Sequence, residues 1–85
     1  MEITTIDELQ KHGRVDFIFR SSHLVVKGVK FVSVYDDPYG VCAIFDGYVP
    51  CFSFDTYFND ILKKVIIVPY GEGLTYKRSL FGYGD

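Results

Sequence analysis

Lysine and arginine are missing from residues 31–62, although the whole chain of 85 residues contains nine of them. The same segment holds five aspartates and nine of the fifteen aromatic residues. The chain carries a formal net charge of −2, and this argues against a general nucleic-acid binder, which needs a basic face for phosphates. We therefore expect one surface that is both acidic and aromatic.

Long apolar runs are also missing. No stretch of 18 apolar residues occurs, and this excludes a transmembrane helix. The first residues, MEIT, lack the basic and apolar regions of a signal peptide. We therefore expect a cytoplasmic protein, in which Cys42 and Cys51 stay reduced and pack as small apolar residues.

The length predicts one small domain over residues 1–85. Aromatic residues make up 18% of the chain, and Val, Phe and Tyr favour strands. The predicted order is a helix, four or five strands, a second helix and one or two further strands. This order is typical of an α+β fold with a mainly antiparallel sheet of about five strands. Residues 82–85 are expected to fray.

Two short helices are predicted, over about residues 5–12 and 56–64. Thr5 and Glu8 have the spacing of a capping box, and Gly13 marks the end of the first helix. Asp55 is the predicted N-cap of the second helix. The core-facing side of the second helix repeats at helical spacing: Phe58, Ile61, Leu62 and Val65.

Strands are predicted at residues 15–20, 23–35, 65–68 and 74–81. Gly28 interrupts the second of these: it forms either a bulge in one bent strand, which we favour, or part of a turn between two short strands. Residues 65–68 are apolar throughout, which is typical of a strand buried on both faces. Residues 36–40 contain a proline and a glycine and predict a tight turn.

A hairpin is predicted at Asp46-Gly47, which lies between the apolar runs 41–45 and 48–54. If this pair centres the turn, the numbers of facing residues sum to 93. Cys42 then faces Cys51 at a distance that a disulfide can span. Pro50 has no N–H to donate, so a longer loop or a bulge is favoured, with this strand at a sheet edge.

This register divides the hairpin side chains between two faces, neither of which is polar. One face carries the cysteines; the other is aromatic and consists of Tyr39, Val41, Ala43, Phe45, Tyr48, Pro50, Phe52 and Phe54. Either helices or a second layer cover both faces, which we favour, or the aromatic face is partly exposed and binds a partner or a second copy of the protein.

The residues available for catalysis or metal binding have no diagnostic spacing. The two cysteines, with His12 and His23, match no structural zinc site. They also match no local motif of a Cys–His enzyme. We therefore expect no metal, no cofactor and no enzymatic activity.

A small basic patch that stacks single-stranded nucleic acid is a weaker interpretation. Its members would be Lys27, Lys30, Tyr76, Lys77 and Arg78. Four basic groups on an acidic chain argue against it.

We interpret the chain as a small protein-binding or regulatory module. The predicted contact surface consists of Asp36, Asp37, Tyr39, Phe45, Asp46 and Tyr48. Acidic groups steer association with a basic protein partner, and aromatic rings supply buried anchors. One concrete form is an inhibitor that blocks the basic nucleic-acid site of a host enzyme, as small phage-encoded proteins such as anti-CRISPRs do; this analogy covers size and charge only. The alternative is an accessory subunit or homo-oligomer that assembles through the aromatic hairpin, residues 41–54.

Overall fold

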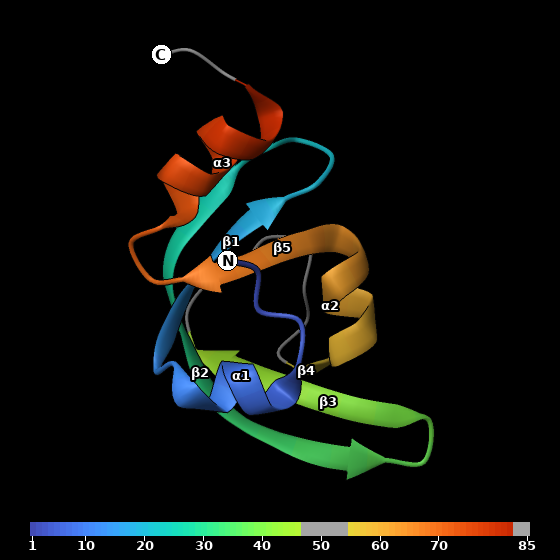
Figure 1. Ribbon diagram of the computed structural model, residues 1–85. Helices are drawn as coiled ribbons and strands as arrows, with labels where there is room; N and C mark the ends of the chain where they lie inside the picture. The colour runs from blue at the N-terminus through green and yellow to red at the C-terminus, as the bar shows by residue number, and fades with distance from the viewer. Residues whose placement is uncertain (47–54, 83–85) are drawn as a thin grey trace.

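The computed structural model describes residues 1–46 and 55–82 and has an α+β fold built on a five-stranded antiparallel sheet (Figure 1). The strand order is β4-β3-β2-β1-β5. The elements in chain order are α1 (Ile6–Lys11), β1 (Arg14–Phe19), β2 (Val25–Asp37), β3 (Gly40–Asp46), β4 (Asp55–Tyr57), α2 (Phe58–Lys64), β5 (Val65–Pro69) and α3 (Gly73–Phe81). The predicted fold class is confirmed.

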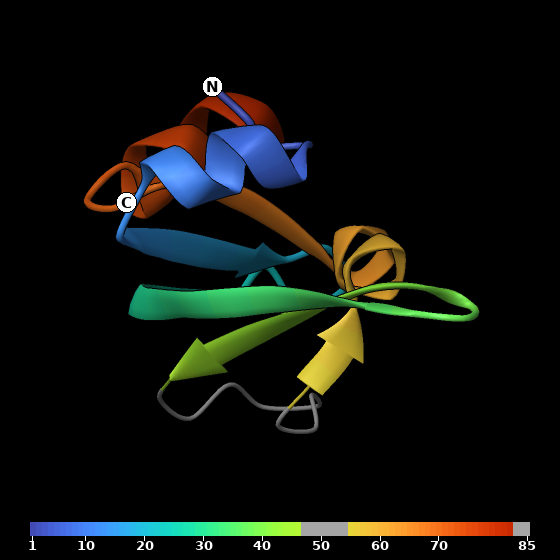
Figure 2. The ribbon, with the colours of Figure 1, turned by 90° about the horizontal axis from the view of Figure 1, so that it is seen from below.

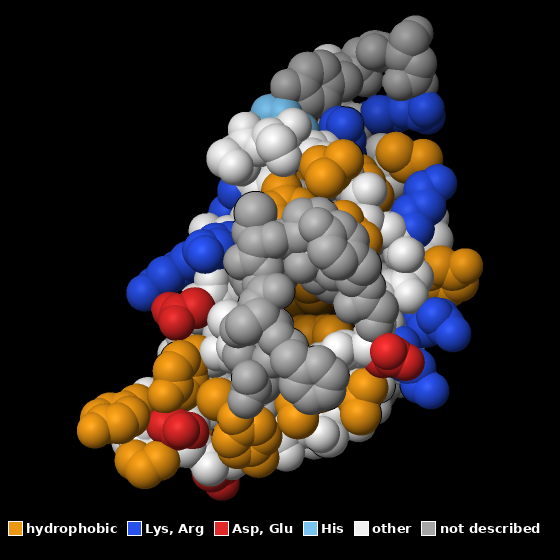
Figure 3. Space-filling view, turned by 180° about the vertical axis from the view of Figure 1, so that it is seen from behind, with side chains coloured by type: hydrophobic (Ala, Val, Ile, Leu, Met, Phe, Trp, Pro, Cys, Tyr) orange, Lys and Arg blue, Asp and Glu red, His pale blue; other side chains and the backbone are white. Residues whose placement is uncertain are grey.

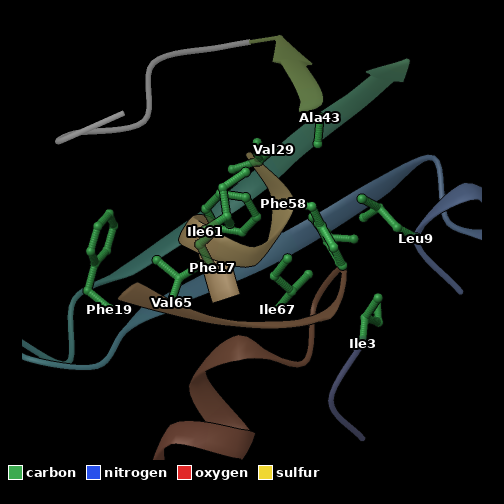
Figure 4. Packing of buried hydrophobic residues seen from close by; sticks show 11 residues of the cluster. Ile3, Leu9, Phe17, Phe19, Val29, Ala43, Phe58, Ile61, Val65 and Ile67 are labelled. Carbon is green, nitrogen blue, oxygen red and sulfur yellow. The ribbon is translucent and has the colours of Figure 1, made fainter. Parts of the chain in front are cut away.

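Strand β1 lies between β2 and β5 and is buried on both faces. On one face, Phe17 belongs to the main core cluster with Leu9 of α1 and Ile61 of α2 (Figure 4). On the other face, Ile18 packs with β5 and with Tyr76 of α3. Seen from below, α1 lies in front and α3 behind it (Figure 2). Around β1, α1 and α2 therefore pack on one face of the sheet and α3 packs on the other.

Helix α1 begins after the predicted N-cap, Thr5. Thr5 Oγ1 accepts a hydrogen bond from Glu8 N at 3.2 Å, and Glu8 Oε1 accepts one from Thr4 N at 3.3 Å. A helix of six residues is too short to persist alone. Its stability comes from packing, and Leu9 is fully buried beneath it.

Strand β2 is one long strand with a bulge at Gly28, which confirms the favoured prediction. Val15 pairs with Val29 and Phe17 pairs with Val26, so β2 contains one more residue than β1 between these pairs. Gly28 has φ +69, in the left-handed region that favours glycine.

Strand β5 is buried along its apolar run, as predicted, although it lies at the end of the strand order. The N-terminal segment runs beside its outer edge. Ile3 N donates to Ile67 O at 2.7 Å, and the Ile3 side chain is buried. A covered edge offers fewer free backbone groups to another chain.

The strand predicted over residues 74–81 is wrong, because this segment forms helix α3. At the helix start, Gly73 N donates to the carboxylate of Asp16 in β1, 57 positions earlier in the chain. At the helix end, Gly82 adopts the left-handed conformation with φ 69. The hydrogen bond between Gly73 and Asp16 joins distant parts of the chain, so the local hydrophobic pattern could not predict it.

The predicted hairpin register is wrong in the part of the chain that the structure describes. Strand β3 pairs with β4, so Cys42 lies opposite Tyr57 instead of Cys51. The prediction took the nearest apolar run as the partner, whereas the partner strand comes later in the sequence. Residues 47–54, which include Tyr48 and Pro50, lie outside the described residues, as do residues 83–85.

The second helix starts two residues later than predicted. Asp55 belongs to β4 instead of capping the helix, and Tyr57 is the residue before α2. Three of the four predicted core-facing residues lie on this helix: Phe58 and Ile61 are buried, and Leu62 packs partly against the same core. The fourth, Val65, is buried but begins β5.

Candidate binding surface

The β2–β3 hairpin ends at one extremity of the molecule, beyond α1 and α2 (Figure 1). Residues 35–41 form this end and are called the hairpin tip below. Asp37 pairs with Gly40, so the connection between the two strands consists of Pro38 and Tyr39 alone. The predicted turn over residues 36–40 is therefore confirmed.

Asp37 holds the turn in place through one oxygen. Its Oδ1 accepts a hydrogen bond from Tyr39 N at 2.9 Å, which closes an Asx turn. The same Oδ1 accepts a second bond from the hydroxyl of Tyr57 in β4 at 2.8 Å. Pro38 restricts its own φ angle. The shape of the turn is thus set by local hydrogen bonds and proline, with little help from burial.

The hydrogen bond from Tyr57 to Asp37 also raises the pKa of Tyr57. This bond is the largest of the causes that raise the pKa of Tyr57 from 10.0 to about 12, and burial and the negative charge of Asp37 act in the same direction. A hydroxyl that donates to a carboxylate must give up that bond when it ionises. The Tyr57 hydroxyl therefore keeps its proton, and its bond to Asp37, to a higher pH than an ordinary tyrosine would.

Apolar side chains at the hairpin tip are exposed. Tyr39 is 88% exposed, Tyr35 42% and Val41 36%. Asp36 is exposed and lies opposite Val41 across the two strands. Seen from behind, hydrophobic and acidic side chains gather at this end, whereas the visible Lys and Arg side chains lie along the two flanks (Figure 3). The tip therefore combines aromatic and acidic groups on one projecting element.

The structure brings together only part of the predicted contact surface. Asp36, Asp37 and Tyr39 all belong to the hairpin tip. Asp46 lies at the opposite end of β3, where it pairs with Lys30. Its separation from the tip is about 17 Å along the strand, at about 3.4 Å per residue. Tyr48 lies outside the described residues.

Phe45, the remaining predicted contact residue, packs against the core. Its ring centroid lies 5.1 Å from that of Phe17 and 5.9 Å from that of Phe31, both in edge-to-face geometry. On the opposite face of β3, Cys42 is a buried free cysteine. The described part of the predicted aromatic face is mixed, because Ala43 is buried and Phe45 packs on the core, whereas Tyr39 and Val41 are exposed. The exposed ring lies at the turn instead.

The described residues considered for catalysis, His12, His23 and Cys42, belong to different parts of the fold, and Cys51 lies outside the described residues. His12 follows α1 as its C-cap. His23 precedes β2 and stacks on Phe81 of α3, with ring centroids 3.7 Å apart. The strand neighbours of Cys42 are Tyr35 and Tyr57. Among the described residues, no group of three or more His, Cys, Asp or Glu side chains could hold a metal ion.

The ring considered for nucleic-acid stacking is engaged within the protein. Tyr76 is half-buried, and its hydroxyl donates to Glu2 Oε2 at 2.9 Å. This bond is the largest cause that raises the pKa of Tyr76 above 10.0. The basic residues nearest to it in sequence, Lys77 and Arg78, lie on α3, whereas Lys27 and Lys30 lie on β2.

Asp16 is a structural residue that the sequence did not reveal. It is 1% exposed, and three backbone N–H groups donate to its carboxylate: Gly28 N to Oδ1 at 3.0 Å, Gly71 N to Oδ2 at 3.0 Å and Gly73 N to Oδ2 at 2.9 Å. Its position inside an otherwise apolar strand was the sequence signal for this role. A carboxylate buried there requires hydrogen-bond donors.

No helix within residues 1–46 and 55–82 is long and apolar enough to span a membrane. Comparisons of the chain with protein-family models, with curated proteins and with solved structures find no match.

Proposed function

We propose that the protein is a small binding and regulatory module that docks onto a basic protein through its hairpin tip. The observation that supports this most directly is the turn, where 88% of the Tyr39 surface is exposed just after Asp36 and Asp37. A ring exposed on a projecting element is accessible to a partner, and tyrosine is enriched at protein interfaces.

The chemistry of the tip suits a basic partner. Tyr is among the residues most enriched at the centres of protein interfaces, because its large ring and hydroxyl bind with little loss of side-chain freedom. Asp36 and Asp37 supply negative charge, and the hairpin tip itself contains no lysine or arginine. Such a charge distribution raises the rate of association with a basic surface and makes binding sensitive to salt.

The ordered turn favours binding by a preformed element. Asp37 already bonds Tyr39 N and the Tyr57 hydroxyl, so the tip loses little conformational entropy on docking. One specific form of this function is inhibition: the tip occupies the basic groove of a nucleic-acid enzyme and excludes its substrate. In that form, this protein and the nucleic acid compete for the same surface of the partner.

Site-specific photocrosslinking tests the proposal. Tyr39 is replaced by p-benzoylphenylalanine, and the labelled protein is irradiated in an extract of its source cells. The matched control carries the same group at Tyr70, which is 61% exposed but lies in the β5–α3 turn. We expect a crosslinked basic protein from position 39 only. The yield should fall as salt rises and should be lost in an Asp36→Lys background.

Two results would contradict this function. The first is equal crosslinking from positions 39 and 70. The second is a position-39 crosslink that is insensitive both to salt and to Asp36→Lys. Asp36→Lys is the cleaner charge reversal, because Asp37 also holds the turn through its bond to Tyr39 N.

A further inference from the structure

A groove of about 570 Å³ lies beside the hairpin tip. Its lining residues come from the hairpin tip (39–41), from the start of α1 (4–6) and from the end of β4 and α2 (57–60 and 63). Its apolar lining includes Ile6, Val41 and Phe58, and Tyr39 stands at its hairpin side. This volume lies within the range of pockets that bind small ligands or side chains.

Aromatic and polar groups meet in this groove. The ring of Tyr57 lines it beside Gly40, where an added Cβ would come 3.4 Å from Tyr57 Cδ1. Glycine at position 40 therefore leaves the face of the hairpin open beside the ring. Asn59 and Asp60 of α2 supply polar groups to the lining.

The charges around the groove are mainly negative. Asp60 lines it directly, and Asp36 lies opposite Val41, which also lines it. Lys63 is the basic residue in the described lining, and its Nζ lies 3.8 Å from Asp60 Oδ1. Both members of that ion pair are more than half exposed, so the pair contributes little stability and can exchange partners.

We propose that this groove receives an arginine side chain of the basic partner, an inference that rests on the proposed function and specifies its chemistry. A guanidinium group is planar, stacks on an aromatic ring and donates in pairs to a carboxylate. Tyr57 supplies the ring, and Asp60 supplies the carboxylate at the start of α2. Tyr39, on the hairpin side of the groove, makes the neighbouring contact with the partner.

A defined peptide pair tests this inference without the natural partner. The probe is the blocked peptide acetyl-Gly-Arg-Gly-Arg-Gly-amide, and the control peptide carries citrulline, which has nearly the same shape and no charge, at both arginine positions. Binding is followed by the amide nuclear magnetic resonance signals of the full-length protein at low salt. We expect saturable shifts at Val41, Tyr57 and Asn59, with a dissociation constant at least about fivefold lower for the arginine peptide.

Three substitutions locate the site. Asp60→Asn and Asp36→Asn should each weaken arginine-peptide binding at least about threefold, whereas Asp46→Asn, at the other end of β3, should leave it unchanged. All three residues are exposed, and each variant is checked by circular dichroism and urea denaturation. Equal binding of the citrulline peptide, shifts centred on α3, or binding that survives both Asp60→Asn and Asp36→Asn would overturn the inference.

Failure of this inference is distinguishable from failure of the proposed function. Crosslinking from position 39 together with no arginine-peptide binding would refute the arginine groove alone. Arginine-peptide binding in the groove together with equal crosslinking from positions 39 and 70 would refute the hairpin tip as the docking element.

Discussion

Asp16 connects three segments that are far apart in the sequence: the bulge of β2, the β5–α3 turn and the start of α3. In Asp16→Asn, an amide NH₂ replaces one carboxylate oxygen and faces backbone N–H groups that need an acceptor. A buried donor left without an acceptor costs about 1–3 kcal/mol, so we expect the free energy of unfolding to fall by about 2–3 kcal/mol. Urea denaturation measures this change.

Asp46→Asn is the matched control, because this carboxylate is exposed at the end of β3. Its effect should stay within about 0.5 kcal/mol. A loss below about 1 kcal/mol in Asp16→Asn would show that the three hydrogen bonds contribute less than their geometry indicates.

The ionisation of Tyr57 should affect the protein in alkaline solution. Its pKa in the folded protein is about 12, above the ordinary value of 10.0. A raised pKa means that the Asp37 bond contributes its full stability below pH 10 and loses it as the pH rises from 10 towards 12. Absorbance titration at 295 nm should therefore show one late phenolate transition that is absent in Tyr57→Phe.

Asp37→Asn removes the charge that raises this pKa. The late transition should then move towards pH 10, because the hydrogen bond to a carboxylate is its largest cause. An unchanged transition would contradict the assignment. Tyr76 also has a raised pKa, through Glu2, and the Tyr57→Phe difference spectrum separates the two.

At the scale of elements, the start of α3 depends on the absence of a side chain at Gly73. An added Cβ would lie 2.9 Å from the Asp16 Cβ and Oδ2 atoms and from Val25 Cγ1. Alanine favours helices over glycine by about 1 kcal/mol, but a forced contact in a packed site typically costs about 1–3 kcal/mol. We expect the contact to dominate, so that Gly73→Ala lowers the free energy of unfolding by about 1–2 kcal/mol.

Gly13→Ala is the control for this substitution, since no atom lies within 4 Å of a Cβ at Gly13 and its φ angle is not positive. Its effect should stay within about 0.5 kcal/mol in the same denaturation experiment. A Gly73→Ala variant as stable as the wild type would mean that α3 shifts freely relative to β1.

The elements that the sequence predicted correctly have their signals within the element itself. The capping residues of α1, the glycine of the β2 bulge and the apolar run of β5 are all local. Two of the wrong predictions, the strand over residues 74–81 and the hairpin register, involve partners elsewhere in the chain. The start of α3 is bound by Asp16, and β3 pairs with residues 55–57 instead of with the next apolar run. Hydrophobic periodicity and turn residues describe a segment alone and cannot predict contacts between distant segments.

Across the whole molecule, the candidate surface was predictable in composition but only partly in geometry. The segment without lysine or arginine does contain the hairpin tip, and three of its six predicted contact residues meet there. Phe45 joined the prediction because it is aromatic, yet its ring packs between Phe17 and Phe31. Composition identifies rings, whereas only the sheet register and the core decide which of them reach solvent.

The contrast between the buried core and the exposed hairpin tip predicts which part of the molecule unfolds locally. Amides of β1 lie in a strand paired on both sides and buried on both faces, whereas the hairpin tip is largely exposed and lies beyond the helices. Exchange at β1 should require global unfolding, and exchange at the tip only local opening. Amide hydrogen exchange followed by nuclear magnetic resonance should therefore be at least about 100-fold faster for Asp36 and Val41 than for Phe17 and Ile18. Equal protection would mean that the tip folds as one unit with the core, and substitutions there would then perturb the fold as well as binding.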